Sequence, residues 1–110
     1  MTVPSEMLTT INGRAVSLDQ IPRHDIAAFQ RIVRREIAAG QRAVSFFGTK
    51  SGQPGTTDLF ILLANDEYGE LNILSARIEG DRFPSLTPDC NQLHLFEREI
   101  AEQFGLKPEG

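Results

Sequence analysis

The chain has 110 residues, of which 40% are hydrophobic and 24% are charged. These values are ordinary for one globular domain and exclude wholesale disorder. The longest apolar run, Leu59–Ala64, is far shorter than the roughly 20 residues that a membrane-spanning helix needs. No basic segment followed by an apolar stretch opens the sequence, so no secretory signal is visible. We therefore expect a single domain over residues 1–110, without direct membrane insertion.

The net charge is −4, but residues 1–55 carry a net charge of +3 and residues 56–110 a net charge of −7. An acidic total argues against a nucleic-acid-binding protein, whereas a bipolar chain suits docking between proteins. Cys90 is the single cysteine, which excludes an internal disulfide, an iron–sulfur cluster and a cysteine zinc site. Neither His24 nor His94 lies in a recognised catalytic signature. We therefore expect no metal or cofactor in this chain, and a reducing, cytoplasmic setting.

The first half of the chain predicts a hairpin followed by a helix. Asn12-Gly13 is the favoured pair for a two-residue turn, so Leu8–Val16 should form a β-hairpin. Residues Asp25 to Ala39 should form a helix that ends at Gly40. Its apolar side chains recur at helical spacing and should be buried: Ile26, Phe29, Val33 and Ile37.

Three strands are expected next. Arg42–Phe47 is a short strand, Asp58–Ala64 is apolar on both faces and so should be central, and Glu70–Ile78 should have one wetter face. Asn65–Gly69 supplies the turn between the last two strands. Gly48–Gly55 lacks the Gly-Lys-Ser/Thr order of a phosphate loop and precedes a strand, so we expect a poorly ordered hairpin loop there.

The chain should end with a loop and a second helix. Gly80–Asp89 reads as a loop, and Thr87-Pro88-Asp89 is a good helix start. This helix should run to Phe104, with Gly105 ending it, and bury Leu93, Phe96, Ile100 and Phe104. The predicted fold is α+β, in two layers: a mixed sheet of about four to five strands with both helices packed on one face.

A charged cluster lies beside the apolar stripe of this last helix. At 100° per residue, Glu97 lies at the edge of the stripe, whereas Arg98, Glu99 and Glu102 point away from it and surround Leu95. Arg98 and Glu102 are an i, i+4 pair that adds only a few tenths of a kcal/mol to helix stability. A contribution to helix stability therefore does not explain why these charged residues are clustered.

Two segments carry a resemblance to a known family. The segment from Glu97-Arg98-Glu99 through Gly105 to Gly110 resembles the signature of the thirty-kilodalton, or C, subunit of respiratory complex I. Phe83-Pro84-Ser85-Leu86-Thr87 resembles a loop of the same family. The wording is closer to a sister group, the N-terminal domain of the large subunit of membrane-bound nickel–iron hydrogenases of the formate-hydrogenlyase and hydrogenase-4 type. The motif-bearing part covers residues 83–110, about a quarter of the chain.

Gln103 departs from the complex I signature, which has an apolar residue there, and this favours the hydrogenase branch. Members of the family continue past the position of Gly110, so the chain looks like a separately expressed domain without the catalytic domain that follows in hydrogenases. The resemblance implies a non-catalytic assembly domain of a cytoplasmic, membrane-peripheral oxidoreductase complex. Its implied partners are the catalytic large-subunit domain and the iron–sulfur small subunit, which would hold the nickel–iron centre or iron–sulfur clusters.

We interpret Leu95, Glu97, Arg98, Glu99 and Glu102 as the interface with that catalytic partner. The competing interpretation is a solvated helix face in which Glu97 only bonds to the loop at Phe83–Thr87. Two other functions remain open. One is a stand-alone regulatory or small-ligand module, and the other is a hydrolase or isomerase that uses Glu97, Glu99 and His94.

Overall fold

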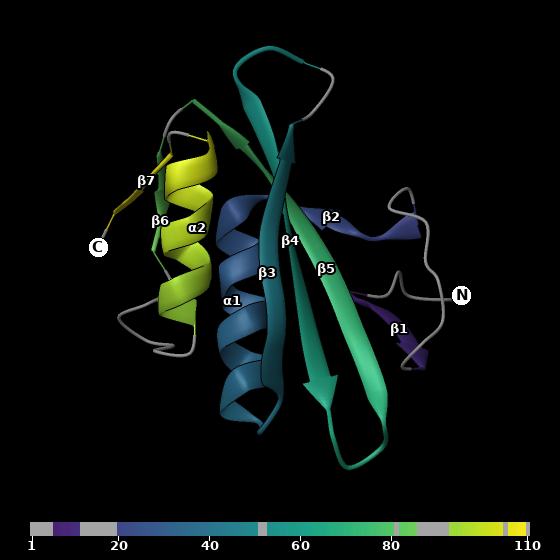
Figure 1. Ribbon diagram of the computed structural model, residues 1–110. Helices are drawn as coiled ribbons and strands as arrows, with labels where there is room; N and C mark the ends of the chain where they lie inside the picture. Colours follow the sequence, from purple (N-terminus) through teal and green to yellow (C-terminus); the bar gives the residue numbers. More distant parts are fainter. Residues whose placement is uncertain are drawn as a thin grey trace.

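The structure is a computed structural model that describes residues 6–11, 20–50, 53–80, 82–85, 93–104 and 106–109. Two helices and seven strands are present in these residues (Figure 1). The helices are α1 (Ile26–Ala38) and α2 (His94–Phe104). In chain order the strands are β1 (Leu8–Ile11), β2 (Arg23–His24), β3 (Arg42–Lys50), β4 (Thr56–Asn65), β5 (Glu70–Glu79), β6 (Arg82–Pro84) and β7 (Lys107–Glu109).

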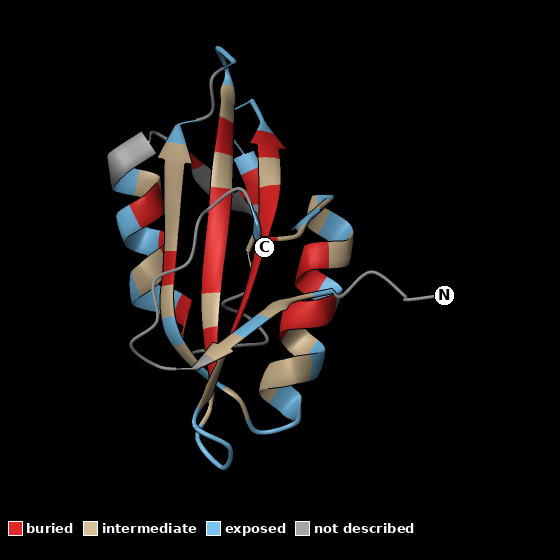
Figure 2. Ribbon diagram, turned by 90° about the vertical axis from the view of Figure 1, so that its right-hand side faces the viewer, coloured by how far each residue is buried: buried red, intermediate tan, exposed pale blue. Residues whose placement is uncertain are grey.

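The main sheet has five strands in the order β1-β5-β4-β3, with β2 pairing with β5 next to β1. The β1–β5, β5–β4 and β4–β3 pairs are antiparallel, whereas β2 runs parallel to β5, so the sheet is mixed. Both helices lie on one face of this sheet, and β1 and β2 extend the sheet beyond β5, at the edge opposite β3 (Figures 1 and 2). The predicted two-layer α+β fold is confirmed.

Strand β4 is buried on both faces, as its uninterrupted apolar sequence predicted. Its odd-numbered residues Leu59, Ile61 and Leu63 are completely buried under the helices. Phe60 points to the opposite face, where a smaller cluster forms. That second cluster consists of Ile21, Phe60 and Ile73, with Leu8, Phe47 and Leu62 packed against it.

The two helices reach the same core through the predicted apolar stripes. In α1, Phe29 and Val33 are completely buried, and Ile26 and Ile37 pack against the core from its edge. Ile32 is also buried, which widens the stripe beyond the predicted positions. In α2, Ile100 is 1% exposed and Phe96 packs against the same cluster. The side chain of Phe104 lies outside the described residues.

Both ends of α1 are closed by local hydrogen bonds. The carboxylate of Asp25 accepts a bond of 2.7 Å from the backbone N–H of Ala28, as an N-cap residue does. At the other end, Gly40 has φ of 106° and donates to the carbonyl of Ile37. Gln41 donates to the carbonyl of Glu36, which completes a Schellman motif. Gly40 therefore ends the helix as predicted.

Strand β3 is longer than predicted, and the expected loop Gly48–Gly55 is correspondingly shorter. Residues 48–50 pair with residues 57–59 of β4, because the antiparallel ladder supplies hydrogen-bond partners that outweigh the loop tendency of Gly48. Residues 51 and 52 lie outside the described residues. Near the other end of β3 the register shifts between Ala43 and Ser45.

The expected loop Gly80–Asp89 also contains a strand. β6 pairs in parallel with β7, and α2 connects the two. The three residues of β6, which include Pro84, are too few to predict a strand from sequence. They form a strand because they pair with β7. The described part of the last helix begins at His94. The predicted turn at Asn12-Gly13, the helix start at Thr87-Pro88-Asp89, Cys90 and Gly105 all lie outside the described residues.

Neither α1, with 13 residues, nor α2, with 11, combines the length and the apolar character that crossing a membrane requires, and the described residues contain no other helix.

Replacing Asp25 with alanine should lower the free energy of unfolding by about 1 kcal/mol, since the amide of Ala28 loses its capping acceptor. Asp25→Ser, which retains a capping oxygen, should keep most of this stability. Urea denaturation of both variants and the parent chain measures the difference. Equal destabilisation by alanine and serine would show that the cap contributes nothing.

Candidate functional site

Helix α2 has one face in the core and one face in solvent. Its inner side chain Ile100, and Leu93 directly before the helix, are buried against the cluster that the sheet and α1 form, and the helix lies against β3. β6 and β7 flank α2 on its other side (Figure 1). The helix therefore lies beside the short parallel pair, in contact with β7.

Glu97 is the buried acid of this helix. Its exposed fraction is only 3%, and its Oε1 atom accepts a hydrogen bond of 2.6 Å from the hydroxyl of Ser85. Ser85 directly follows β6, whose Phe83 is buried in the core. A buried carboxylate needs such a partner, because the loss of water around it is costly. The bond fixes the segment after β6 against the first turns of α2.

Four of the five predicted interface residues share the exposed face of α2. Leu95, Arg98, Glu99 and Glu102 are spaced i, i+3, i+4 and i+7, which places them on one side of the helix. Leu95 is 66% exposed, an unusual value for a leucine. Arg98 approaches Glu102 at 3.5 Å, and both side chains are largely exposed, so this ion pair adds little to stability. Charged side chains thus surround one exposed apolar side chain.

Glu97, the fifth predicted interface residue, does not lie on this face. Its position at the edge of the apolar stripe carries it inward, and its bond to Ser85 is the contact that the competing interpretation assigned to it. A partner that docks on the exposed face of α2 would therefore contact the other four residues. Glu97 would act indirectly, because its hydrogen bond to Ser85 holds the helix in position.

The residues of the alternative hydrolase differ in their surroundings. His94 and Glu99 are exposed, whereas Glu97 is buried. General acid–base catalysis requires the participating groups to reach one substrate. Glu97 is turned into the fold and hydrogen-bonded to Ser85, whereas His94 and Glu99 face solvent. In the part of the chain that the structure describes, no three His, Cys, Asp or Glu side chains are grouped to hold a metal ion.

The face of the sheet opposite the helices holds a cavity that the sequence did not predict. Arg77 donates two hydrogen bonds to Asp58 there, with its Nε 2.8 Å from Oδ1, and both side chains are partly buried. This contact raises the pKa of the Arg77 guanidinium. The sequence did offer one signal for this pair, since Asp58 lies at the start of an apolar strand and Arg77 near the end of the next strand. Their pairing depends on the register between β4 and β5.

No protein-family model and no curated protein matches the chain. The resemblance to the complex I and hydrogenase families therefore rests only on the two sequence segments that carry it. Ser85 belongs to the first of these segments and Glu97 to the second, and the hydrogen bond between them joins the segments in space.

Removing the carboxylate of Glu97 should destabilise the fold. Glu97→Ala should lower the free energy of unfolding by about 1–3 kcal/mol, because the half-buried hydroxyl of Ser85 loses its acceptor. Glu97→Gln, which retains an acceptor oxygen, should cost less. Chemical denaturation measures both changes.

Glu99→Ala is the matched control, since it removes an exposed carboxylate two residues away in the same helix. It should change stability by no more than about 0.5 kcal/mol. Equal effects of Glu97→Ala and Glu99→Ala would contradict a structural role of the bond to Ser85.

Proposed function

We propose that this chain is a non-catalytic assembly domain of a membrane-associated oxidoreductase complex of the NADH dehydrogenase or nickel–iron hydrogenase kind. The observation that carries the proposal is the hydrogen bond between Ser85 and Glu97. This bond links the two family-like segments: Ser85 of the first segment holds α2, which carries Glu97 of the second. Three charged residues of the second segment, Arg98, Glu99 and Glu102, are left exposed.

The exposed residues of that segment support a docking role. Arg98, Glu99 and Glu102 gain little stability from one another, and they surround an apolar side chain that faces solvent. A buried apolar anchor within a charged rim is a common arrangement at protein–protein contacts. In this proposal the exposed face of α2 contacts the catalytic large-subunit domain, in cis or as a separate subunit.

The same proposal assigns the electron-transfer chemistry to the partners. The nickel–iron centre or iron–sulfur clusters belong to the catalytic large-subunit domain and the iron–sulfur small subunit, and this domain braces them. The complex lies on the cytoplasmic side of the membrane, and this chain is peripheral to it. Its acidic net charge of −4 agrees with protein partners rather than nucleic acid.

The proposal predicts that Arg98→Ala and Glu99→Ala separate assembly from stability. Each variant should unfold within about 0.5 kcal/mol of the parent chain, because both side chains are exposed. Each should weaken binding to the catalytic large-subunit domain by roughly 2–5 kcal/mol, the cost of removing one partner from a desolvated charged contact. Thermal unfolding and a quantitative pull-down with the purified large subunit measure the two effects.

Arg31→Ala is the control, since it removes an exposed arginine from α1 instead of α2. It should bind the large subunit as the parent chain does. If Arg98→Ala and Glu99→Ala also assemble normally, the docking role is wrong and the exposed face of α2 is only solvated.

A further inference from the structure

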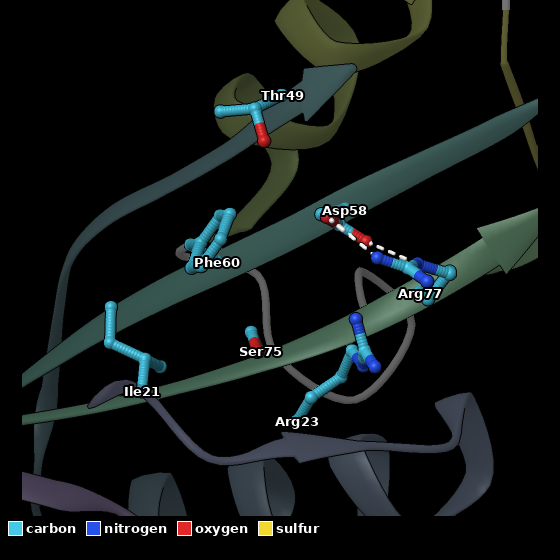
Figure 3. A pocket seen from close by; sticks show the side chains of 7 residues that line it. All are labelled: Ile21, Arg23, Thr49, Asp58, Phe60, Ser75 and Arg77. Carbon is cyan, nitrogen blue, oxygen red and sulfur yellow. Dashed lines mark hydrogen bonds and ion pairs between the residues drawn. The ribbon is translucent and has the colours of Figure 1, made fainter. Parts of the chain in front are cut away.

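The open face of the sheet contains a cavity of about 530 Å³, a volume in the range of small-molecule sites. Its lining side chains lie on the face of the sheet opposite both helices (Figure 3). Within the described parts of the chain it is lined by Ile21, Arg23, Thr49, Asp58, Phe60, Ser75 and Arg77.

Strand register brings the lining residues together in two rows across the sheet. One row runs from Thr49 through Asp58 to Arg77, each residue being directly opposite the next. The parallel row runs from Phe60 to Ser75 and on to Arg23 of β2. Side chains that are opposite one another, or two residues apart, on neighbouring strands point to the same face. The cavity is therefore built by four strands of one sheet.

The charges of these residues leave one positive charge without compensation. Arg77 is held by Asp58, which takes two of its five N–H donors and balances its charge. Among the described residues, the guanidinium of Arg23 has no hydrogen-bond or ion-pair partner. Its guanidinium points toward Arg77 across the cavity (Figure 3). Two guanidinium groups that face each other, with a carboxylate bound to Arg77 alone, attract an anion.

The remaining walls supply an apolar surface and two hydroxyl groups. Phe60 is buried, with an exposed fraction of 6%, and its ring stacks on that of Phe47 with centroids 5.4 Å apart, so the ring is fixed in place. Ile21 lies next to it in the same cluster. The hydroxyl of Ser75 donates to the carbonyl of Pro22, so toward the cavity it can only accept.

We propose that this cavity binds a small organic anion with one carboxylate group and a flat apolar body. The carboxylate lies between Arg23 and the donors of Arg77 that Asp58 leaves free. The apolar body packs on Phe60 and Ile21. Guanidinium groups bind carboxylates through charge-assisted hydrogen bonds of fixed geometry, which gives the site its selectivity.

The charge balance favours a single negative charge over two. One carboxylate neutralises Arg23 and leaves the lining side chains without net charge. Glu79, whose charge also raises the pKa of Arg77, is a further negative group nearby that disfavours a second charge on the ligand. A phosphate dianion would leave an excess negative charge beside Asp58, which is disfavoured in a partly buried site. The site is independent of the proposed assembly role, because it lies on the face of the sheet opposite α2.

Benzoate is a suitable probe, and benzamide is its uncharged counterpart of the same shape. Titration of the ¹⁵N-labelled chain at constant ionic strength, followed by NMR, should shift the amide signals of residues 75–77 with benzoate. Benzamide should bind at least about tenfold more weakly, as should benzoate to Arg23→Gln, since each change removes a charge-assisted contact. Arg31→Gln, an exposed arginine of α1, should bind benzoate as the parent chain does.

Phenyl phosphate tests the preference for one charge. The parent chain should bind it more weakly than benzoate, and Asp58→Asn should reverse this order by removing the competing carboxylate. The proposal is overturned if benzoate causes no shift at residues 75–77, if benzamide binds equally well, or if Arg23→Gln binds benzoate unchanged. Tighter binding of phenyl phosphate by the parent chain would also overturn it.

Discussion

The ten-residue antiparallel ladder between β4 and β5 is the constraint on which the other features of the molecule depend. Successive side chains of a strand point to opposite faces, so one register divides both strands into a helix side and an open side. Leu59, Ile61 and Leu74 go to the helix side, where they form the main core. Phe60, Ser75 and Arg77 go to the open side and line the cavity. A shift of one residue would exchange the two faces.

Substitutions on the helix side of the sheet should be poorly tolerated, because this side is buried and both helices contribute to its core. α1 and α2 are far apart in sequence, yet Phe29, Val33 and Ile100 belong to one buried cluster. Among the side chains of α2 that the structure describes, Glu97 is the buried polar one, and it accepts a hydrogen bond from Ser85. The short β6–β7 pair and this hydrogen bond fix where α2 lies. They therefore also fix the direction in which its charged outer face points.

The two proposed surfaces lie on opposite sides of the molecule, one on α2 and one on the face of the sheet away from the helices. Their roles can therefore be tested separately. The exposed face of α2 is proposed to contact a large subunit, whereas the cavity under β2 is proposed to hold a carboxylate. Arg98 and Arg23 illustrate the difference. Arg98 pairs weakly with Glu102 in solvent, whereas Arg23 faces a second guanidinium that is already held by Asp58. A substitution in one surface should leave the other unaffected.

The sequence by itself determined the helices, the three long strands and the α+β class, because local periodicity and end signals such as Asp25 and Gly40 are encoded within a few residues of one another. It also separated the exposed charges of α2 from its apolar stripe. Only the tertiary structure decided that Gly48–Lys50 belongs to β3, that β6 pairs with β7, and that Glu97 is buried on Ser85. It alone brought Arg23, Asp58 and Arg77 into one cavity. Those features depend on register and on contacts between distant segments, which a local pattern does not specify.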